Sequence, residues 1–121
     1  MARMKAVAGV TEDFESCILQ ISKEDEPLAH IILDPSELDI LIRGLADARS
    51  KMRDPVSPEL DPSVRIHFEN YPAWRVFAEH SGIPGIAMAF RHSGMGWLGF
   101  LLHEEQATAI GKSLSETPAK A

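Results

Sequence analysis

The sequence predicts an α+β fold, in which a mainly antiparallel sheet of about six strands carries two helices on one face. Two segments have the apolar spacing of amphipathic helices, and several others have the alternation or the short apolar runs of strands. The strands fall into two groups, and each group ends in a helix. The expected order is therefore ββα followed by ββββα, folded as a two-layer sandwich.

Length and composition favour one globular domain. The chain has 121 residues, of which 45% are hydrophobic and 25% charged, as in an average globular protein. Residues 1–12 are expected to form a loose leader and residues 116–121 a tail. Between them, a ββα half (14–53) is joined by a proline-rich linker (54–63) to a ββββα half (64–115).

The first half predicts a hairpin and a well-defined helix. Residues 14–21 and 28–33 are rich in strand formers and flank a charged turn. The following segment predicts a helix over residues 35–52, with Asp34 as its N-cap and a proline at its first position. Glu37 stands three residues after the cap, which is the spacing of a capping box.

The second half predicts a four-stranded meander and a closing helix. The helix is expected over residues 104–114. The turns before and after the third strand each contain His-Ser-Gly, which favours a reversal of the chain. The four strands are expected at residues 64–68, 73–78, 85–90 and 97–102.

The stretch FLLHEEQATAIG contains a His-Glu pair that is similar to the start of a metalloprotease motif. That motif needs a second histidine at position 107, which is alanine. An offset of 69 residues (103 − 34) places His103 opposite Asp34 at a helix entrance, with Glu104 and Glu105 in the first turn, where carboxylates are favoured. We interpret the pair as a helix start, and shared supersecondary structure explains the likeness of the halves without duplication.

Charge and cysteine content exclude several classes of function. A net charge of −6 disfavours a binder of duplex nucleic acid. The single cysteine, Cys17, excludes an intrachain disulfide and a zinc site of several thiolates, so a cytoplasmic location is expected. No secretory signal is apparent, and Arg91 interrupts the longest apolar region, residues 83–102, so no membrane span is expected.

The sequence contains no motif for metal binding or nucleophilic catalysis. The histidines lack the close spacing of a ligand pair, so no metal and no cofactor are expected. Cys17 lies in an apolar run, and Ser81 in a turn without a nucleophile motif. The five histidines are His30, His67, His80, His92 and His103.

One face of the predicted meander is a candidate for recognition. Alternation sends apolar residues to the face that would meet the helices, and cationic and aromatic residues with small alanines to the other. Such a face favours a sheet-to-sheet dimer contact, and it is also compatible with an anionic ligand or a single nucleic-acid strand. The candidate residues are Arg65, His67, Arg75, Phe77 and Arg91.

Because no catalytic constellation is found, the leading hypothesis is a small cytoplasmic, non-enzymatic binding or assembly protein. It would form a homodimer through the open sheet face. The first alternative is an enzyme, or a ligand or metal pocket, that uses His30, His67 and Glu69. The second alternative is a module that binds single-stranded nucleic acid.

Overall fold

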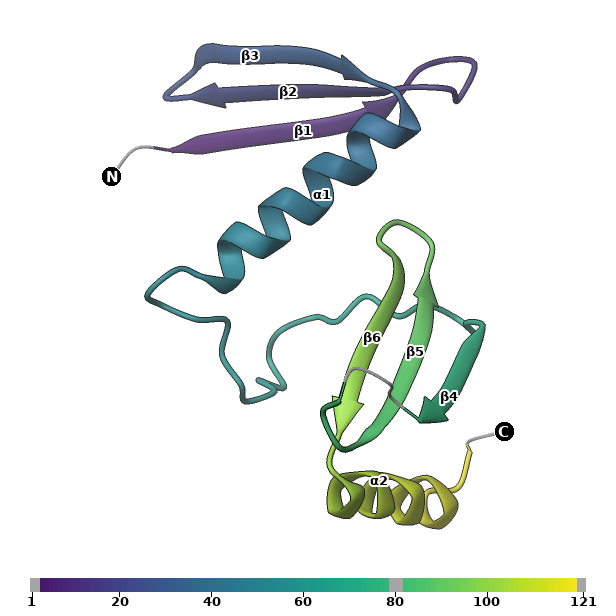
Figure 1. The fold of residues 1–121 in the computed structure, drawn as a ribbon. Coiled ribbons are helices and arrows are strands. Elements are labelled where there is room, and N and C mark those ends of the chain that lie inside the picture. The colour runs from purple at the N-terminus through teal and green to yellow at the C-terminus, as the bar shows by residue number, and fades with distance from the viewer. Residues whose placement is uncertain (1–2, 79–81, 120–121) are drawn as a thin grey trace. The chain divides into compact units, whose positions relative to one another are not determined.

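The computed structural model describes residues 3–78 and 82–119 of the chain. The chain divides into two compact units, Met1–Asp61 and Pro62–Ala121. Each unit contains a three-stranded antiparallel sheet followed by a helix, as Figure 1 shows. The α+β class is confirmed. The order is βββα-βββα rather than the expected ββα-ββββα, and a single six-stranded sheet is not seen.

The first unit contains β1 (Met4–Val10), β2 (Cys17–Lys23), β3 (Glu26–Leu33) and α1 (Pro35–Ser50). Its sheet has the order β1-β2-β3, with antiparallel neighbours. The β2–β3 connection is a two-residue turn, and both of its residues have positive φ, 51° at Glu24 and 65° at Asp25. Two positive φ values identify a type I′ turn, whose twist matches that of the strands it joins.

Strand β1 corrects the expectation of a loose leader over residues 1–12. It pairs with β2 along its whole length, from Met4 opposite Lys23 to Val10 opposite Cys17. The backbone hydrogen bonds of this ladder and the apolar partners across it order the segment, although its alanines and glycine have low strand propensity.

The second unit contains β4 (Trp74–Ala78), β5 (Ile86–His92), β6 (Gly96–Leu102) and α2 (Glu104–Glu116). Its sheet has the order β4-β5-β6, again antiparallel. Three of the four expected strands of the meander are therefore present.

The strand expected at residues 64–68 is absent, and the expectation was wrong. The chain has no regular structure there, in a segment that runs between Pro62 and Pro72. Strand propensity is expressed only where a neighbouring strand completes the ladder, and β4 pairs with β5 alone. Tyr71, with φ of 51°, bends the backbone just before β4.

Both helices begin where the sequence predicts. At α1 the Asp34 carboxylate accepts a hydrogen bond from the Glu37 backbone N–H at 2.8 Å, and the Glu37 carboxylate accepts one from the Asp34 N–H at 3.0 Å. This is the expected capping box. At α2, His103 occupies the N-cap without a side-chain capping bond, and Glu104 and Glu105 lie in the first turn. The interpretation of the His-Glu pair as a helix start is confirmed.

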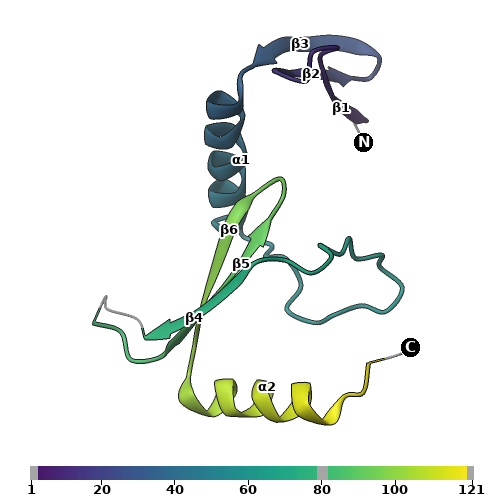
Figure 2. The same ribbon diagram turned by 90° about the vertical axis from the view of Figure 1, so that its right-hand side faces the viewer.

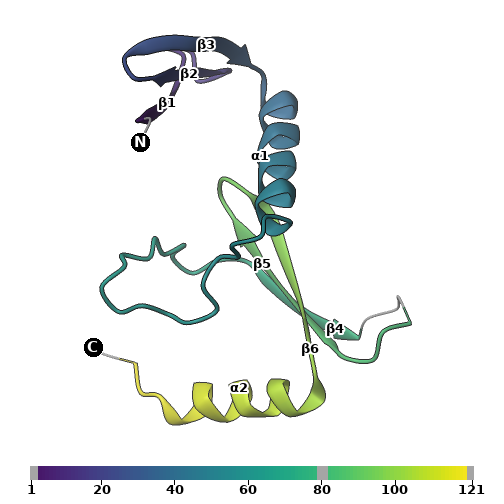
Figure 3. The same cartoon turned by 90° about the vertical axis from the view of Figure 1, so that its left-hand side faces the viewer.

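The expected placement of both helices on one sheet face is not confirmed. Neither α1 nor α2 contributes a buried residue. In Figures 2 and 3 each helix leaves the end of its preceding strand and runs away from the sheet of its own unit. Among the described residues, the buried hydrophobic side chains are only those of Cys17, Ala87 and Leu102.

Candidate functional site

The strand register gathers apolar side chains on one face of the first sheet. Residues that lie directly opposite each other in an antiparallel ladder point to the same side. From the pairs Val10–Cys17 and Cys17–Leu33, the residues on this side are apolar as far as the pair Ala6–Ile21. The next pair is Met4–Lys23, where a charged residue ends the apolar surface. We call it the first apolar face; it comprises Ala6, Ala8, Val10, Cys17, Leu19, Ile21, Ala29, Ile31 and Leu33.

The second sheet has a corresponding surface. Its register places Trp74 opposite Phe90, and Phe90 opposite Leu98, so that three strands contribute to one side. On this side the apolar residues extend to the turn between β5 and β6, where the pair His92–Gly96 ends them. We call it the second apolar face; it comprises Trp74, Val76, Ala78, Ile86, Met88, Phe90, Leu98, Phe100 and Leu102.

The two apolar faces correspond position by position. Cys17 and Ile86 begin equivalent strands at an offset of 69 residues (86 − 17), and the same offset relates β3 to β6 and the start of α1 to that of α2. For β1 and β4 the offset is 68, as the end residues Val10 and Ala78 show (78 − 10). The likeness between residues 32–45 and 101–114 thus extends to a whole βββα topology.

Large side chains on both faces are exposed. On the first face Val10 is 63% exposed and Ile31 42% exposed. On the second face the values are 66% for Trp74 and 55% for Phe100. Single exposed apolar residues are common, but a contiguous apolar surface of this kind marks a site of interaction.

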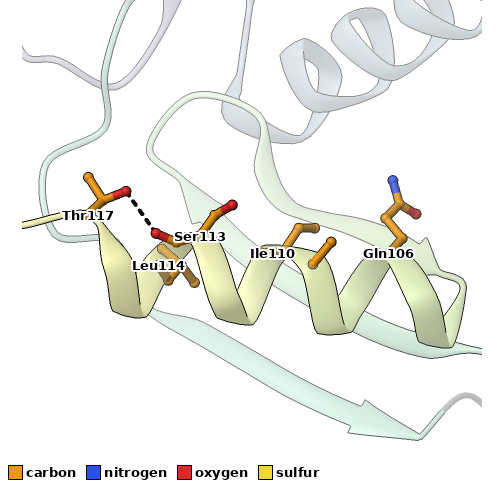
Figure 4. Close-up of a pocket in the computed structure, with 6 residues that line it drawn as sticks. Gln106, Ile110, Ser113, Leu114 and Thr117 are labelled. Atoms are coloured by element: carbon orange, nitrogen blue, oxygen red, sulfur yellow. Dashed lines mark hydrogen bonds between the residues drawn. The ribbon is translucent and has the colours of Figure 1, made fainter.

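The helices leave matching apolar stripes only partly covered. Figure 4 shows the side chains that line a shallow groove along α2. Ile110 and Leu114 are its large apolar residues, and Gln106, Ser113 and Thr117 are its polar residues. The spacing of three and four residues places these side chains on one side of the helix. On α1 the equivalent stripe comprises Leu38, Leu41, Ile42 and Leu45. The first three are half-buried, and Leu45 is 62% exposed.

A polar cluster forms at the β5–β6 turn. Glu69 Oε1 accepts hydrogen bonds from the Ser93 hydroxyl at 2.5 Å and from the Ser93 backbone N–H at 2.9 Å. His92 Nε2 lies 3.5 Å from the same oxygen. The Ser93 hydroxyl, followed by the Ser93 N–H, lowers the pKa of Glu69, because both donors stabilise the carboxylate; His92 and Arg91 add smaller effects in the same direction.

The geometry of this cluster does not activate the serine. Its hydroxyl donates to Glu69 and not to His92. The His92 Nδ1 accepts the backbone N–H groups of Gly94 at 2.9 Å and Met95 at 3.0 Å, so it is not available to remove the hydroxyl proton. The cluster instead ties the irregular segment 62–73 to the hairpin. Sequence reasoning missed it, because Glu69 and Ser93 are far apart in the chain and follow no motif.

The structure separates the five residues of the predicted recognition face. Arg75 and Phe77 on β4 and Arg91 on β5 share the side of the second sheet opposite the second apolar face. Arg65 and His67 belong to the irregular segment 62–73 and to no strand.

The three residues of the alternative hypothesis, an enzyme or a ligand pocket, belong to different units. His30 lies on β3 of the first unit, whereas His67 and Glu69 belong to the second. Within residues 3–78 and 82–119, no group of three His, Cys, Asp or Glu side chains is arranged to hold a metal ion. The candidate nucleophile Cys17 is buried in the first apolar face. His80 and Ser81 lie outside the described residues.

Comparison with protein-family models, with curated proteins and with solved structures finds no match to this chain. In the part of the chain that the structure describes, no helix combines the length and the apolar character needed to span a membrane.

Proposed function

We propose that this protein is a non-enzymatic assembly protein that forms a homodimer through its apolar sheet faces. The observation that carries the proposal is the pair of equivalent, uncharged faces, each with large exposed side chains. Removing apolar surface from water stabilises an association by about 25 cal/mol per Å². Two surfaces of this kind on one chain favour association with a second copy.

The exposed area is large enough for a stable dimer. The chain exposes 11233 Å². Two separate, compact domains of the size of these units would together expose only roughly 7,800 Å² by the scaling of surface with mass. The excess, roughly 3,400 Å² per chain, is larger than the roughly 800 Å² per partner that a standard interface buries.

The second sheet offers two sides for this contact. The side with Arg75, Phe77 and Arg91 is the one that the sequence predicted, and it carries two guanidinium groups. The nine residues of the second apolar face are uncharged, so burying them desolvates no ion, whereas the contact between His92 and Glu69 lies at the turn end of this side. We therefore assign the contact to the apolar face and keep the arginine side as the second candidate.

Native mass spectrometry and light scattering test the dimer directly. We expect a mass twice the 13.3 kDa of the chain. Phe100→Asp on the second apolar face should convert it to monomer. Trp97→Asp is a matched control, because both side chains are 55% exposed on the same strand but point to opposite sides. A wild-type monomer at ~100 µM would refute the dimer, and monomers from Trp97→Asp alone would move the contact to the arginine side.

A further inference from the structure

Each helix follows its strand after a single residue. Asp34 alone separates β3 from α1, and His103 alone separates β6 from α2. Both connectors are extended, with ψ of 170° at Asp34 and 152° at His103. A helix that folds back over the sheet of its own strand normally needs a connection of about two to six residues. These connectors are therefore shorter than the usual connection, and neither helix buries a residue against the sheet of its own unit.

The local hydrogen bonds hold the connectors in this form. The capping box ties Asp34 to Glu37, and Pro35 sets the φ angle of the first helical position. At α2, the carbonyl of His103 already accepts the N–H of Ala107 at 2.9 Å, so the helix begins immediately. Both units thus have the same short hinge, and in both the helix contributes no buried residue.

Each unit contains both layers of a hydrophobic core, but the connector holds them apart. The first apolar face is one layer, and the stripe of Leu38, Leu41, Ile42 and Leu45 on α1 is the other. In the second unit the layers are the second apolar face and the groove of α2. A short hinge that prevents closure within one chain is the usual condition for exchange of an element between two copies.

We infer, on the basis of the proposed homodimer, that the dimer exchanges its helices. The apolar stripe of α1 in one protomer lies on the first apolar face of the second copy, and α2 lies on the second apolar face of that copy. This arrangement covers the helix stripes and the sheet faces together. It also explains why the same uncovered pair occurs in both units of the chain.

The native cysteine provides a direct test, because Cys17 belongs to the first apolar face. Single cysteines are introduced at Leu38, Leu41, Ile42 and Leu45 in the full chain. The variants are then oxidised with Cu(II)-phenanthroline. As two thiols form one disulfide, two copper complexes each accept one electron and the two protons pass to the buffer. A disulfide forms only where the Cα atoms approach within about 7 Å. We expect a covalent dimer from at least one variant.

Three controls define the origin of a crosslink. The wild-type protein reports any Cys17–Cys17 bond. Each variant combined with Cys17→Ala reports bonds between two helices. Arg43→Cys, on the other side of α1, should not link to Cys17. An exclusively intramolecular disulfide, or no link from any stripe position in a wild-type dimer, would overturn the exchange.

Longer hinges provide the second test. Insertion of Gly-Ser-Gly-Ser after Leu33 and after Leu102 should allow each helix to cover its own sheet, and the dimer should become a helical monomer by circular dichroism and light scattering. A wild-type monomer would refute the proposed homodimer. A wild-type dimer that gives no link between Cys17 and α1, and that remains a dimer with longer hinges, would refute only the exchange.

Discussion

At the scale of single residues, Gly85 is the position with the least room for a side chain. A Cβ atom there would lie 2.7 Å from the Leu102 carbonyl oxygen, and its φ of 155° is unfavourable for other residues. We expect Gly85→Ala to lower the free energy of unfolding by about 1–3 kcal/mol. The control is Gly99→Ala, since a Cβ at Gly99 meets nothing within 4 Å. Urea unfolding measures both variants, and equal midpoints would contradict the steric argument.

The Glu69 cluster predicts an acid dependence of stability. The usual pKa of a glutamate is 4.5, and in the folded state the Ser93 hydroxyl lowers that of Glu69. The ionised carboxylate therefore stabilises the fold above pH 4.5, and this contribution is lost as the pH falls through the lowered pKa. Glu69→Gln should flatten the decline of the unfolding midpoint below that pH. Glu59→Gln, in the proline-rich segment, should leave the wild-type profile unchanged.

At the scale of elements, the β2–β3 turn uses residues that are poorly suited to its geometry. Glu24 and Asp25 both have positive φ, whereas type I′ turns prefer Asn-Gly. Replacing the pair by Asn-Gly should raise the free energy of unfolding by about 0.5–1 kcal/mol, because less strain remains in the turn. Glu24→Gln is the control and should be neutral in the same thermal melt. A destabilised Asn-Gly variant would show that the turn is not type I′.

The two helix starts differ in their caps, and this difference predicts opposite effects. His103 makes no side-chain capping bond, so His103→Asp should stabilise α2 by about 1 kcal/mol. The negative charges of Glu104 and Glu105 lie close to the new carboxylate, and their repulsion reduces the gain. Asp34→Ala removes an existing cap and should cost about 1 kcal/mol. Helix content by circular dichroism and unfolding midpoints measure both effects; a loss of helicity in His103→Asp would contradict the prediction.

The elements that the sequence predicted well are those with local signals. Both helices begin at the predicted residue because the signals, a cap and first-turn carboxylates, lie within a few positions of the start. Strands depend on partners elsewhere in the chain. Residues 64–68 have strong strand formers but no ladder, whereas β1 has weak formers and pairs fully with β2. Propensity alone could not distinguish these two segments.

The same reasoning applies to the candidate site. Alternation along β4 and β5 predicted which residues share a side of the second sheet, because side chains of a strand alternate whatever its neighbours are. The first apolar face was not predicted, since it requires β1. Glu69 and Ser93 could not be paired from sequence, because that contact depends on the path of the irregular segment 62–73.

At the scale of the whole molecule, average composition led to the expectation of one two-layer sandwich. Composition gives the number of apolar residues, and periodicity indicates which face of a helix or strand they occupy. Neither determines which helix covers which sheet face. The length of the connector between strand and helix bears on which helix covers which sheet. With one residue between strand and helix in both units, the helix stripe and the sheet face of a unit stay apart. In the proposed homodimer, the second copy would complete this core.

Coupling between folding and association predicts a stability that depends on protein concentration. If the apolar faces are buried only in the dimer, each tenfold increase in concentration should stabilise the folded dimer by about 1.4 kcal/mol. The melting temperature should then rise by several degrees over a hundredfold range of concentration. Differential scanning fluorimetry measures this directly, with the two tryptophans, Trp74 and Trp97, as the signal.

The matched variants separate this coupling from nonspecific effects of concentration. Phe100→Asp removes the contact of the second apolar face and leaves that of the first, so its melting temperature should be lower than that of the wild type at every concentration. Trp97→Asp changes an equally exposed residue on the other side of β6 and should keep the concentration dependence of the wild type. A wild-type melting temperature that stays constant over the hundredfold range would mean that the chain completes its core without a second copy.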